Sequence, residues 1–213
     1  MKSRLPLTRT AMVLGILVIA SLLPEGCLFD TRTPEPPIAS GQCPLPVTST
    51  PDSVLVGLSV AMGCRSTSGT PTGRQSYEGL LTDDFSFVPD PIDSSDFVSI
   101  DPSAVRFVDN WTKSVESSVF NVYTIESKRL SLVFPESTIV AESADSIRAD
   151  YVLKRYTASD TVGVTDSTVY TGRALLTVVP VAGGYRISRW EDQRSTGTSW
   201  GWLRLTTRKS LGS

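Results

Sequence analysis

The sequence predicts an α+β domain, in which N-terminal helices pack in the concave face of a curved antiparallel sheet. Apolar residues recur at helical spacing between residues 51 and 119, whereas they alternate with polar residues from residue 130 onward. Gly183-Gly184, between the last two alternating runs, is typical of a tight hairpin. Helices followed by a run of strands are the order expected of an α+β domain.

The first helix is expected over residues 51–63. Thr50 is a favourable N-cap residue, Pro51 suits the first helical position, and Asp52 is favoured at the positive end of the helix dipole. The apolar residues at helical spacing are Val54, Leu55, Leu58, Ala61 and Met62. Residues 65–73, rich in Ser, Thr and Gly, are predicted to form an exposed loop.

A short second helix is predicted over residues 74–81, with Tyr77 on its inward face. A strand follows, in which Phe85 and Phe87 share one face because side chains alternate along a strand.

Residues 91–101 are interpreted as a loop. A third helix is predicted after a cap at Asp101 or Ser103, contains Trp111 and continues to about Val119.

Four alternating segments predict the remaining strands: residues 130–134, 147–154, 168–179 and 185–192. The charged side of the second segment, with Arg148, Asp150 and Lys154, is interpreted as an exposed face with cross-strand pairing rather than an anion site. The tail, residues 200–205, is amphipathic and carries Trp200 and Trp202. Because two exposed Trp side chains are unusual, we expect the tail to cap the open end of the domain; contact with a partner is the alternative.

The N-terminus resembles a secretory signal. Three basic residues precede a 13-residue apolar run over residues 11–23, which is short for a membrane span, and Cys27 follows soon after. We expect cleavage before Cys27 and lipid attachment to it, in the manner of a palmitoylated bacterial lipoprotein. An ordinary signal cleaved elsewhere and an uncleaved anchor are the alternatives.

The expected organisation is a signal peptide over residues 1–26, a lipid-anchored, Pro-rich tether over residues 27–50, a domain over residues 51–207 and a tail over residues 208–213. The mature chain then carries 17 Lys and Arg against 21 Asp and Glu. This mild acidity gives no reason to expect nucleic acid as a partner. One domain of this length can bury a single core.

Cysteine and histidine content limits the chemistry. With lipid on Cys27, Cys43 and Cys64 form an even pair in an oxidising compartment, and we expect a disulfide; two free thiols are the alternative. The chain has no histidine, which excludes His-activated nucleophiles and His-ligated metals. We expect no metal and no cofactor.

The chain resembles the nuclear transport factor 2-like superfamily, which includes ketosteroid isomerases and polyketide cyclases. The resemblance covers about residues 51–192 and depends on a Tyr-bearing second helix before Leu80-Leu81-Thr82-Asp83-Asp84-Phe85, on Trp111 and Glu116, and on the closing run from Gly183 to Asp192. It implies a cone-shaped, cystatin-like roll with a pocket between sheet and helices. Because members include enzymes and binders, the resemblance carries over no catalytic residue.

The candidate pocket residues are Tyr77, Trp111, Glu116, Tyr151 and Trp190. Glu116 is either a buried base with a raised pKa or, as we favour, a solvated acid beside a core Trp. Tyr77, Tyr151, Trp190 and Tyr170 fit apolar patterns typical of a core. Trp190 also shares a strand face with Asp192.

The leading hypothesis is a non-enzymatic lipoprotein of the cell envelope, at the outer membrane if the cell has two, whose cone binds a small apolar ligand or an envelope protein. One alternative is an isomerase, dehydratase or cyclase that uses Glu116, Asp84 or Asp192 with a Tyr donor. Another is a structural module with a solid cone, as a homodimer through the outer sheet.

Overall fold

The computed structural model describes residues 43, 46–64, 73–127, 129–158 and 165–212. The chain divides into two units, residues 1–37 and residues 38–213, and every described residue belongs to the second. The signal-like segment and Cys27 lie outside the described residues, as do residues 65–72 of the loop predicted over residues 65–73. Gly73 begins a helix instead. Within the described part, no helix is long and apolar enough to cross a bilayer.

The second unit begins with helices and continues with strands, as predicted. Its elements are α2 (Ser53–Gly63), α3 (Gly73–Gly79), β1 (Leu81–Val88), α4 (Pro91–Ile100), η1 (Pro102–Phe107), α5 (Lys113–Glu126), β2 (Arg129–Val133), η2 (Glu136–Thr138), β3 (Val140–Ser143), β4 (Ser146–Ala158), β5 (Thr165–Val181), β6 (Gly184–Arg194) and α6 (Trp200–Leu211).

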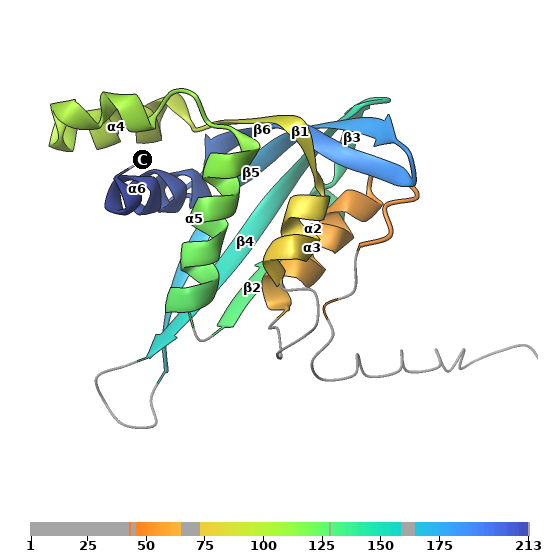
Figure 1. The fold of residues 1–213 in the computed structure, drawn as a ribbon, viewed down its shortest axis with the longest axis horizontal. Coiled ribbons are helices and arrows are strands. Elements are labelled where there is room, and N and C mark those ends of the chain that lie inside the picture. Colours follow the sequence, from red (N-terminus) through yellow and green to blue (C-terminus); the bar gives the residue numbers. More distant parts are fainter. Residues whose placement is uncertain (1–42, 44–45, 65–72, 128, 159–164, 213) are drawn as a thin grey trace, which may run out of the picture. The chain divides into compact units, whose positions relative to one another are not determined.

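The strands form one curved sheet in the order β1-β6-β5-β4-β2, with β3 paired to β4 (Figure 1). The predicted α+β class is therefore confirmed, but the sheet is mixed rather than antiparallel, because β1 pairs with β6 in parallel. The two strands are separated by about a hundred residues, so no local pattern in the sequence reveals their relative direction. The other ladders are antiparallel, as predicted.

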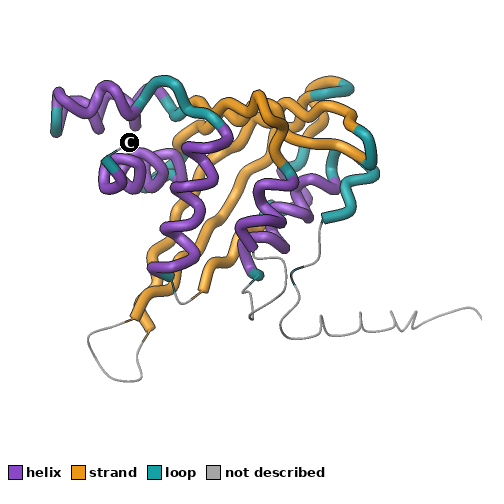
Figure 2. The backbone as a smooth tube through the Cα atoms, viewed as in Figure 1, coloured by secondary structure: helices purple, strands orange, loops and turns teal. Residues whose placement is uncertain are grey.

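Helices α2, α5 and α6 pack on the sheet, and α3 lies against α2 and α5 (Figure 1). Their inward residues and those of the sheet form one hydrophobic cluster. Helix α4 and η1 lie against α6 (Figure 2). The C-terminal helix is thus enclosed between the sheet on one side and α4, η1 and α5 on the others, which places its side chains in the interior.

Helix α2 begins two residues later than predicted and ends at Gly63, as predicted. Thr50 is not its N-cap. The Thr50 carbonyl oxygen instead accepts hydrogen bonds from the Ser53 backbone N–H at 3.2 Å and the Ser53 hydroxyl at 2.5 Å, which makes residues 50–53 a turn before the helix.

Residues 91–100 form α4, so the interpretation of residues 91–101 as a loop was wrong. The Asp90 carboxylate caps the helix by accepting a hydrogen bond from the Ile92 N–H at 2.7 Å, and Pro91 is the first helical residue. Only Asp93 and Phe97 are buried on this helix. Without a continuous apolar stripe, helical periodicity could not reveal it.

The predicted third helix is divided into η1 and α5, and Trp111 lies between them rather than on a helix. Asn110 has a φ of 57°, a left-handed conformation that interrupts the helical path and that Asn tolerates better than most residues. Trp111 then runs beside β1, where its carbonyl oxygen accepts the Phe87 N–H at 3.4 Å. Thr112 caps α5, which continues to Glu126.

The hairpin at Gly183-Gly184 is confirmed. Residues 182 and 183 connect β5 to β6, and Val181 pairs with Gly184. Gly183 and Gly184 have φ values of 92° and 142°, which favour glycine. A Cβ on Gly184 would also lie 2.4 Å from the Thr48 carbonyl oxygen, so this glycine lets the chain before α2 approach the hairpin.

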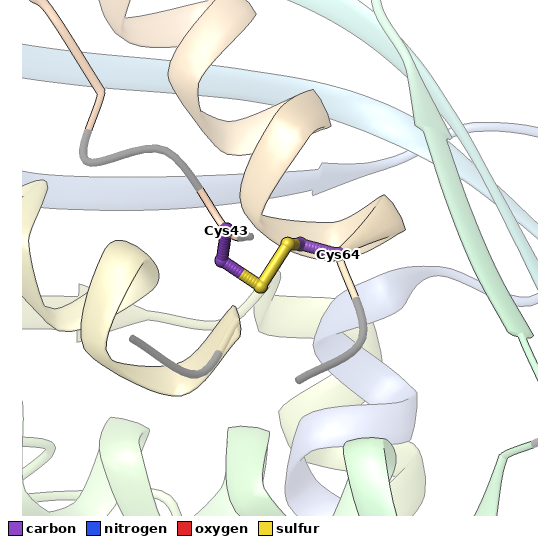
Figure 3. Close-up of a disulfide and its surroundings, with 2 residues drawn as sticks. All are labelled: Cys43 and Cys64. Atoms are coloured by element: carbon purple, nitrogen blue, oxygen red, sulfur yellow. A yellow bond between two sulfur atoms is a disulfide. The ribbon is translucent and has the colours of Figure 1, made fainter. Parts of the chain in front are cut away.

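The predicted disulfide between Cys43 and Cys64 is present, and it joins the segment before α2 to the residue that ends this helix (Figure 3). Residues 46–50, assigned to the tether, also contact the folded unit. The Thr48 carbonyl oxygen accepts the Tyr185 N–H at 2.8 Å, and Thr48 is buried. A covalent bond and a backbone hydrogen bond therefore fix the end of this segment to the body.

Candidate functional site

The five candidate pocket residues converge in the interior from five parts of the chain. Tyr77 comes from α3, Trp111 from the segment before α5, Glu116 from the first turn of α5, Tyr151 from β4 and Trp190 from β6. Each side chain is buried, with at most 3% of each residue exposed. The interpretation of Glu116 as a solvated acid was therefore wrong, whereas the assignment of the aromatic residues to the core is confirmed.

Glu116 accepts hydrogen bonds on both carboxylate oxygens. Its Oε1 accepts from the Tyr77 hydroxyl at 2.5 Å and from Nε and Nη2 of Arg204 at 3.0 and 2.9 Å. Its Oε2 accepts from Trp111 Nε1 at 2.7 Å. Four donors and one full positive charge compensate the burial of this carboxylate.

Arg204 enters the interior from α6 and is itself fully buried. Its guanidinium carbon lies 4.3 Å from the ring centroids of Phe87 and Trp190 and 4.0 Å from that of Trp200. Its Nη2 also donates to the Tyr77 hydroxyl at 3.2 Å. A cation surrounded by aromatic faces gains electrostatic stabilisation in addition to its ion pair. We call Tyr77, Phe87, Trp111, Glu116, Trp190, Trp200 and Arg204 the Arg204 cluster.

The electrostatics of the cluster favour an ion pair. Burial would lower the pKa of Arg204, but the adjacent Glu116 carboxylate outweighs it, so this pKa lies above its ordinary value. Burial, reinforced by Glu116, raises the pKa of Tyr77, which keeps its hydroxyl protonated as a donor. Oε1 of Glu116 accepts bonds from Tyr77 and Arg204, and Oε2 accepts one from Trp111, so both oxygens serve the internal structure of the cluster.

A second polar group lies where α6 begins. The Tyr151 hydroxyl donates to Asp192 Oδ2 at 3.1 Å and accepts the Trp200 N–H at 2.9 Å, while the Gly201 N–H donates to Asp192 Oδ2 at 2.7 Å. Asp192 and Tyr151 therefore satisfy N–H groups that the first turn of a helix leaves unpaired. A Cβ on Gly201 would lie 2.5 Å from Asp192 Oδ2, so glycine permits this close approach.

Asp192 is buried, and burial raises its pKa to about 6 despite the opposing effects of Arg204 and Tyr151. Its Oδ1 has no hydrogen-bond partner among the described residues. The same holds in that part of the chain for four other buried side-chain atoms: Tyr123 OH, Trp190 Nε1, Trp200 Nε1 and Arg204 Nη1. All of these atoms belong to the Arg204 cluster or to residues electrostatically coupled to Arg204.

Further contacts hold α6 in place. Ser199 caps the helix by accepting the Trp202 N–H at 2.9 Å, and its hydroxyl donates to Asp93. Arg208 Nη1 donates to the carbonyl oxygens of Phe107 and Asp109 at 2.9 and 2.7 Å. The expectation that residues 200–205 cap the open end of the domain is thus confirmed, and these residues also fill part of the interior.

Three cavities lined by described residues lie outside the cluster. One of about 430 Å³ lies between α4, the end of β6 and α6, and includes Asp96, Ile100, Arg194 and Trp202. Two others, of about 400 and 250 Å³, lie beside α2. None of the three is lined by a candidate pocket residue.

Sequence reasoning missed the residue at the centre of the site. Arg204 was not a candidate, although its position four residues after Trp200 and between Leu203 and Leu205 places a charge within an apolar stretch. That pattern was the available signal. Asp84, proposed as an alternative acid, is exposed and lies outside the cluster, and Cys27 lies outside the described residues.

No family model matches the chain, and neither does any curated protein. Solved structures do match in fold. A protein assigned as a scytalone dehydratase, from Novosphingobium aromaticivorans DSM 12444, is 11% identical with a TM-score of 0.42, over 67% of this chain and 77% of its own. A nuclear transport factor 2-like protein of unknown function from Exiguobacterium sp. 255-15 is 8% identical, with a TM-score of 0.44. The match covers 68% of this chain and 99% of that protein.

A ketosteroid isomerase-like protein from Erwinia carotovora atroseptica SCRI1043 is 14% identical, with a TM-score of 0.37 over 58% of this chain and 82% of its own. The descriptions of the last two name the superfamily that the sequence resembles or its ketosteroid isomerases. The similarity concerns the arrangement of helices and strands, and it says nothing about the chemistry of this chain.

Proposed function

We propose that this chain is a non-enzymatic lipoprotein of the cell envelope, whose folded unit binds another protein through its surface. Three features support this proposal: the signal-like N-terminus that ends at Cys27, the Pro-rich stretch after it, and the Cys43–Cys64 disulfide, a bond that persists in oxidising compartments.

The observation that carries the binding part of the proposal is the filled interior. Arg204 occupies the space beside Glu116, and the Trp200 and Trp190 rings pack at 4.8 Å. A small apolar ligand would have to displace a buried ion pair to enter. Binding to the outer surface requires no such displacement, so an envelope protein is the better-supported partner.

The surface that best suits a protein partner lies on α4 and η1. Ile92, Ile100 and Val105 are 58, 72 and 53% exposed. Ile100 also lines the 430 Å³ cavity together with Trp202. Exposed aliphatic residues beside a cleft with an aromatic wall are typical of protein-binding surfaces.

Mass spectrometry of the mature N-terminus tests the anchoring. We expect a peptide that begins at Cys27 and carries acyl chains, and a protein that fractionates with membranes. The C27S variant should lose the acyl mass and leave the membrane fraction. An unmodified Cys27 in a mature chain would contradict this part of the proposal.

Cross-linking in intact cells, followed by purification, tests the surface. We expect Ile100→Asp to lose a protein that the wild type retains, because a charge in the apolar contact is costly. Val133→Asp, at an exposed position on β2, is the matched control and should retain it. If both variants retain the cross-linked protein, the α4 surface is excluded as its binding site. A solution that contains only homodimers, measured by light scattering, would favour the structural alternative.

An acid–base activity is the second candidate, because the buried Asp192 has a pKa of about 6 and lies beside the Tyr151 hydroxyl. It requires α6 to move, because Asp192 is buried beside the first turn of this helix. Proton exchange of small ketones in D₂O, followed by NMR, tests it with D192N as the control. Exchange that depends on Asp192 would favour an enzyme, and exchange equal in both proteins would remove this candidate.

A further inference from the structure

We infer that the interior of the folded unit is a binding site for a guanidinium cation, and that the chain fills this site with its own Arg204. Trp200, on α6 itself, supplies the nearest ring at 4.0 Å, and the rest of the wall comes from other elements. Tyr77 lies on α3, Phe87 on β1, Glu116 on α5 and Trp190 on β6. These residues would form an aromatic and acidic recess whichever cation entered it.

The recess has the chemistry that recognises cations. Phe87 and Trp190 present ring faces within 4.3 Å of the guanidinium carbon, and Glu116 supplies the counter-charge at 2.9 Å. Buried aromatic faces around a carboxylate attract cations strongly, because no water competes for the charge.

The geometry favours a guanidinium over an ammonium group. Nε and Nη2 of Arg204 both donate to Glu116 Oε1, and Nη2 also donates to the Tyr77 hydroxyl. Three ring centroids lie within 4.3 Å of the guanidinium carbon. A planar fork with several donors can meet these partners simultaneously, whereas a compact ammonium group cannot also stack on the rings.

Arg204 does not use the whole site. Its Nη1 and Asp192 Oδ1 are both buried without a partner among the described residues, although the two side chains interact electrostatically. The side chain of Arg204 is restrained by its helix. Because a free guanidinium is not restrained by a helix, we expect it to bond to Asp192 as well as to Glu116.

Chemical rescue of full-length Arg204→Ala tests the inference. The probe is ethylguanidinium, which supplies the atoms that this substitution removes, and N-ethylurea is its neutral counterpart. We expect ethylguanidinium to raise the Tm of R204A in a saturable manner and to bind at least about tenfold more tightly than N-ethylurea, because only the cation pairs with Glu116. The wild type, whose site is filled, should show no saturable rise.

Arg208→Ala is the matched control on the same helix. The Arg208 guanidinium donates to the backbone carbonyl oxygens of Phe107 and Asp109 and lies 5.1 Å from the Trp111 ring centroid. The Arg204 guanidinium pairs with a buried carboxylate instead, so we expect weaker rescue of R208A than of R204A. If R204A does not fold alone, the same titration is followed as recovery of the near-UV circular dichroism of its buried Trp residues. Equal effects of cation and urea on R204A, or equal rescue of R204A and R208A, would overturn the inference.

Asp192 provides a second check. In the double variant R204A/D192N, the affinity for ethylguanidinium should fall, since one carboxylate is lost. Unchanged affinity would contradict the two-carboxylate site. The inference is independent of the proposed function, which assigns partner binding to the outer surface. Its failure would leave the tests on Cys27 and Ile100 untouched.

Discussion

The interior and the outer face of the sheet both contain an arginine–carboxylate pair of similar length, in opposite surroundings. Arg204 and Glu116 lie 2.9 Å apart with side chains 0 and 1% exposed, whereas Arg173 and Asp150 lie 2.7 Å apart with side chains 45 and 39% exposed. Distance therefore does not distinguish them. Water weakens the attraction within the outer pair. The inner pair is isolated from solvent, so its charges are stabilised by the hydrogen-bond donors, acceptors and rings that surround them.

The outer pair behaves as the sequence suggests. Asp150 on β4 lies opposite Arg173 on β5, and Arg148 pairs with Glu142 on β3, so the interpretation of Arg148 and Asp150 as an exposed, cross-strand paired face is confirmed. Removal of one partner leaves the other hydrated. Removal of one partner of the inner pair leaves the other charge buried, with neither a counter-charge nor water around it. We therefore expect substitutions inside to cost more stability than substitutions on the outer face.

The largest effect is expected for Glu116→Ala. It leaves the Arg204 charge buried without its counter-charge, and we expect a loss of about 3–5 kcal/mol in the free energy of unfolding. Urea unfolding measures it. Glu116→Gln, which keeps an acceptor for Arg204 and Tyr77, should lose less. A loss below about 1 kcal/mol in E116A would show that the interior is hydrated like the outer face.

The pH dependence of Asp192 sharpens the contrast further. Its folded pKa of about 6 lies above the ordinary value near 4, so the folded chain binds this proton more tightly than the unfolded chain. The stabilisation from the protonated acid is complete below about pH 4 and is lost as the pH rises through about 6, a change of about 3 kcal/mol.

The measurement compares the unfolding free energies of wild type and D192N between pH 4 and 7. The wild type should lose stability relative to D192N as the pH rises, because Asn does not ionise. Parallel curves for the two proteins would mean that Asp192 is solvated.

A smaller loss is expected for Tyr151→Phe. It removes the acceptor of the Trp200 N–H and a donor to Asp192, and unsatisfied buried groups cost about 1–3 kcal/mol. Thermal unfolding measures the loss. Tyr156→Phe, in the same strand but only half-buried, is the control and should change stability less. Equal effects would remove the polar junction at the start of α6 as a cause.

The smallest effect is expected for Arg173→Ala, at most about 1 kcal/mol, because the pair is exposed and each partner is readily hydrated. Once Arg173 is removed, the further loss of Asp150 should change the stability of the protein little. R173A and R173A/D150A should therefore unfold at similar urea concentrations. A loss as large as that of E116A would erase the distinction between the two regions.

Local signals in the sequence predicted most elements but not how they meet. Alternation located β2, β4, β5 and β6, and Gly183 located their last turn. The same reasoning missed α4, which lacks an apolar stripe. It also placed Trp111 on a helix, because the helical spacing of apolar residues does not show that the backbone changes direction at Asn110. Of the Arg204 cluster, it found Tyr77, Trp111, Glu116 and Trp190, but it missed Arg204, because a charged residue is rarely expected in a core.

By itself, the sequence determined that helices precede the main run of strands, the Cys43–Cys64 pair, the absence of histidine and a C-terminal segment too aromatic to remain exposed. Only the tertiary structure decided that β1 joins the sheet in parallel and that α6 brings Arg204 to Glu116. The physical reason is range. Helical and strand periods are set by neighbouring residues, whereas the burial of a charge depends on partners 88 positions apart, as these two are.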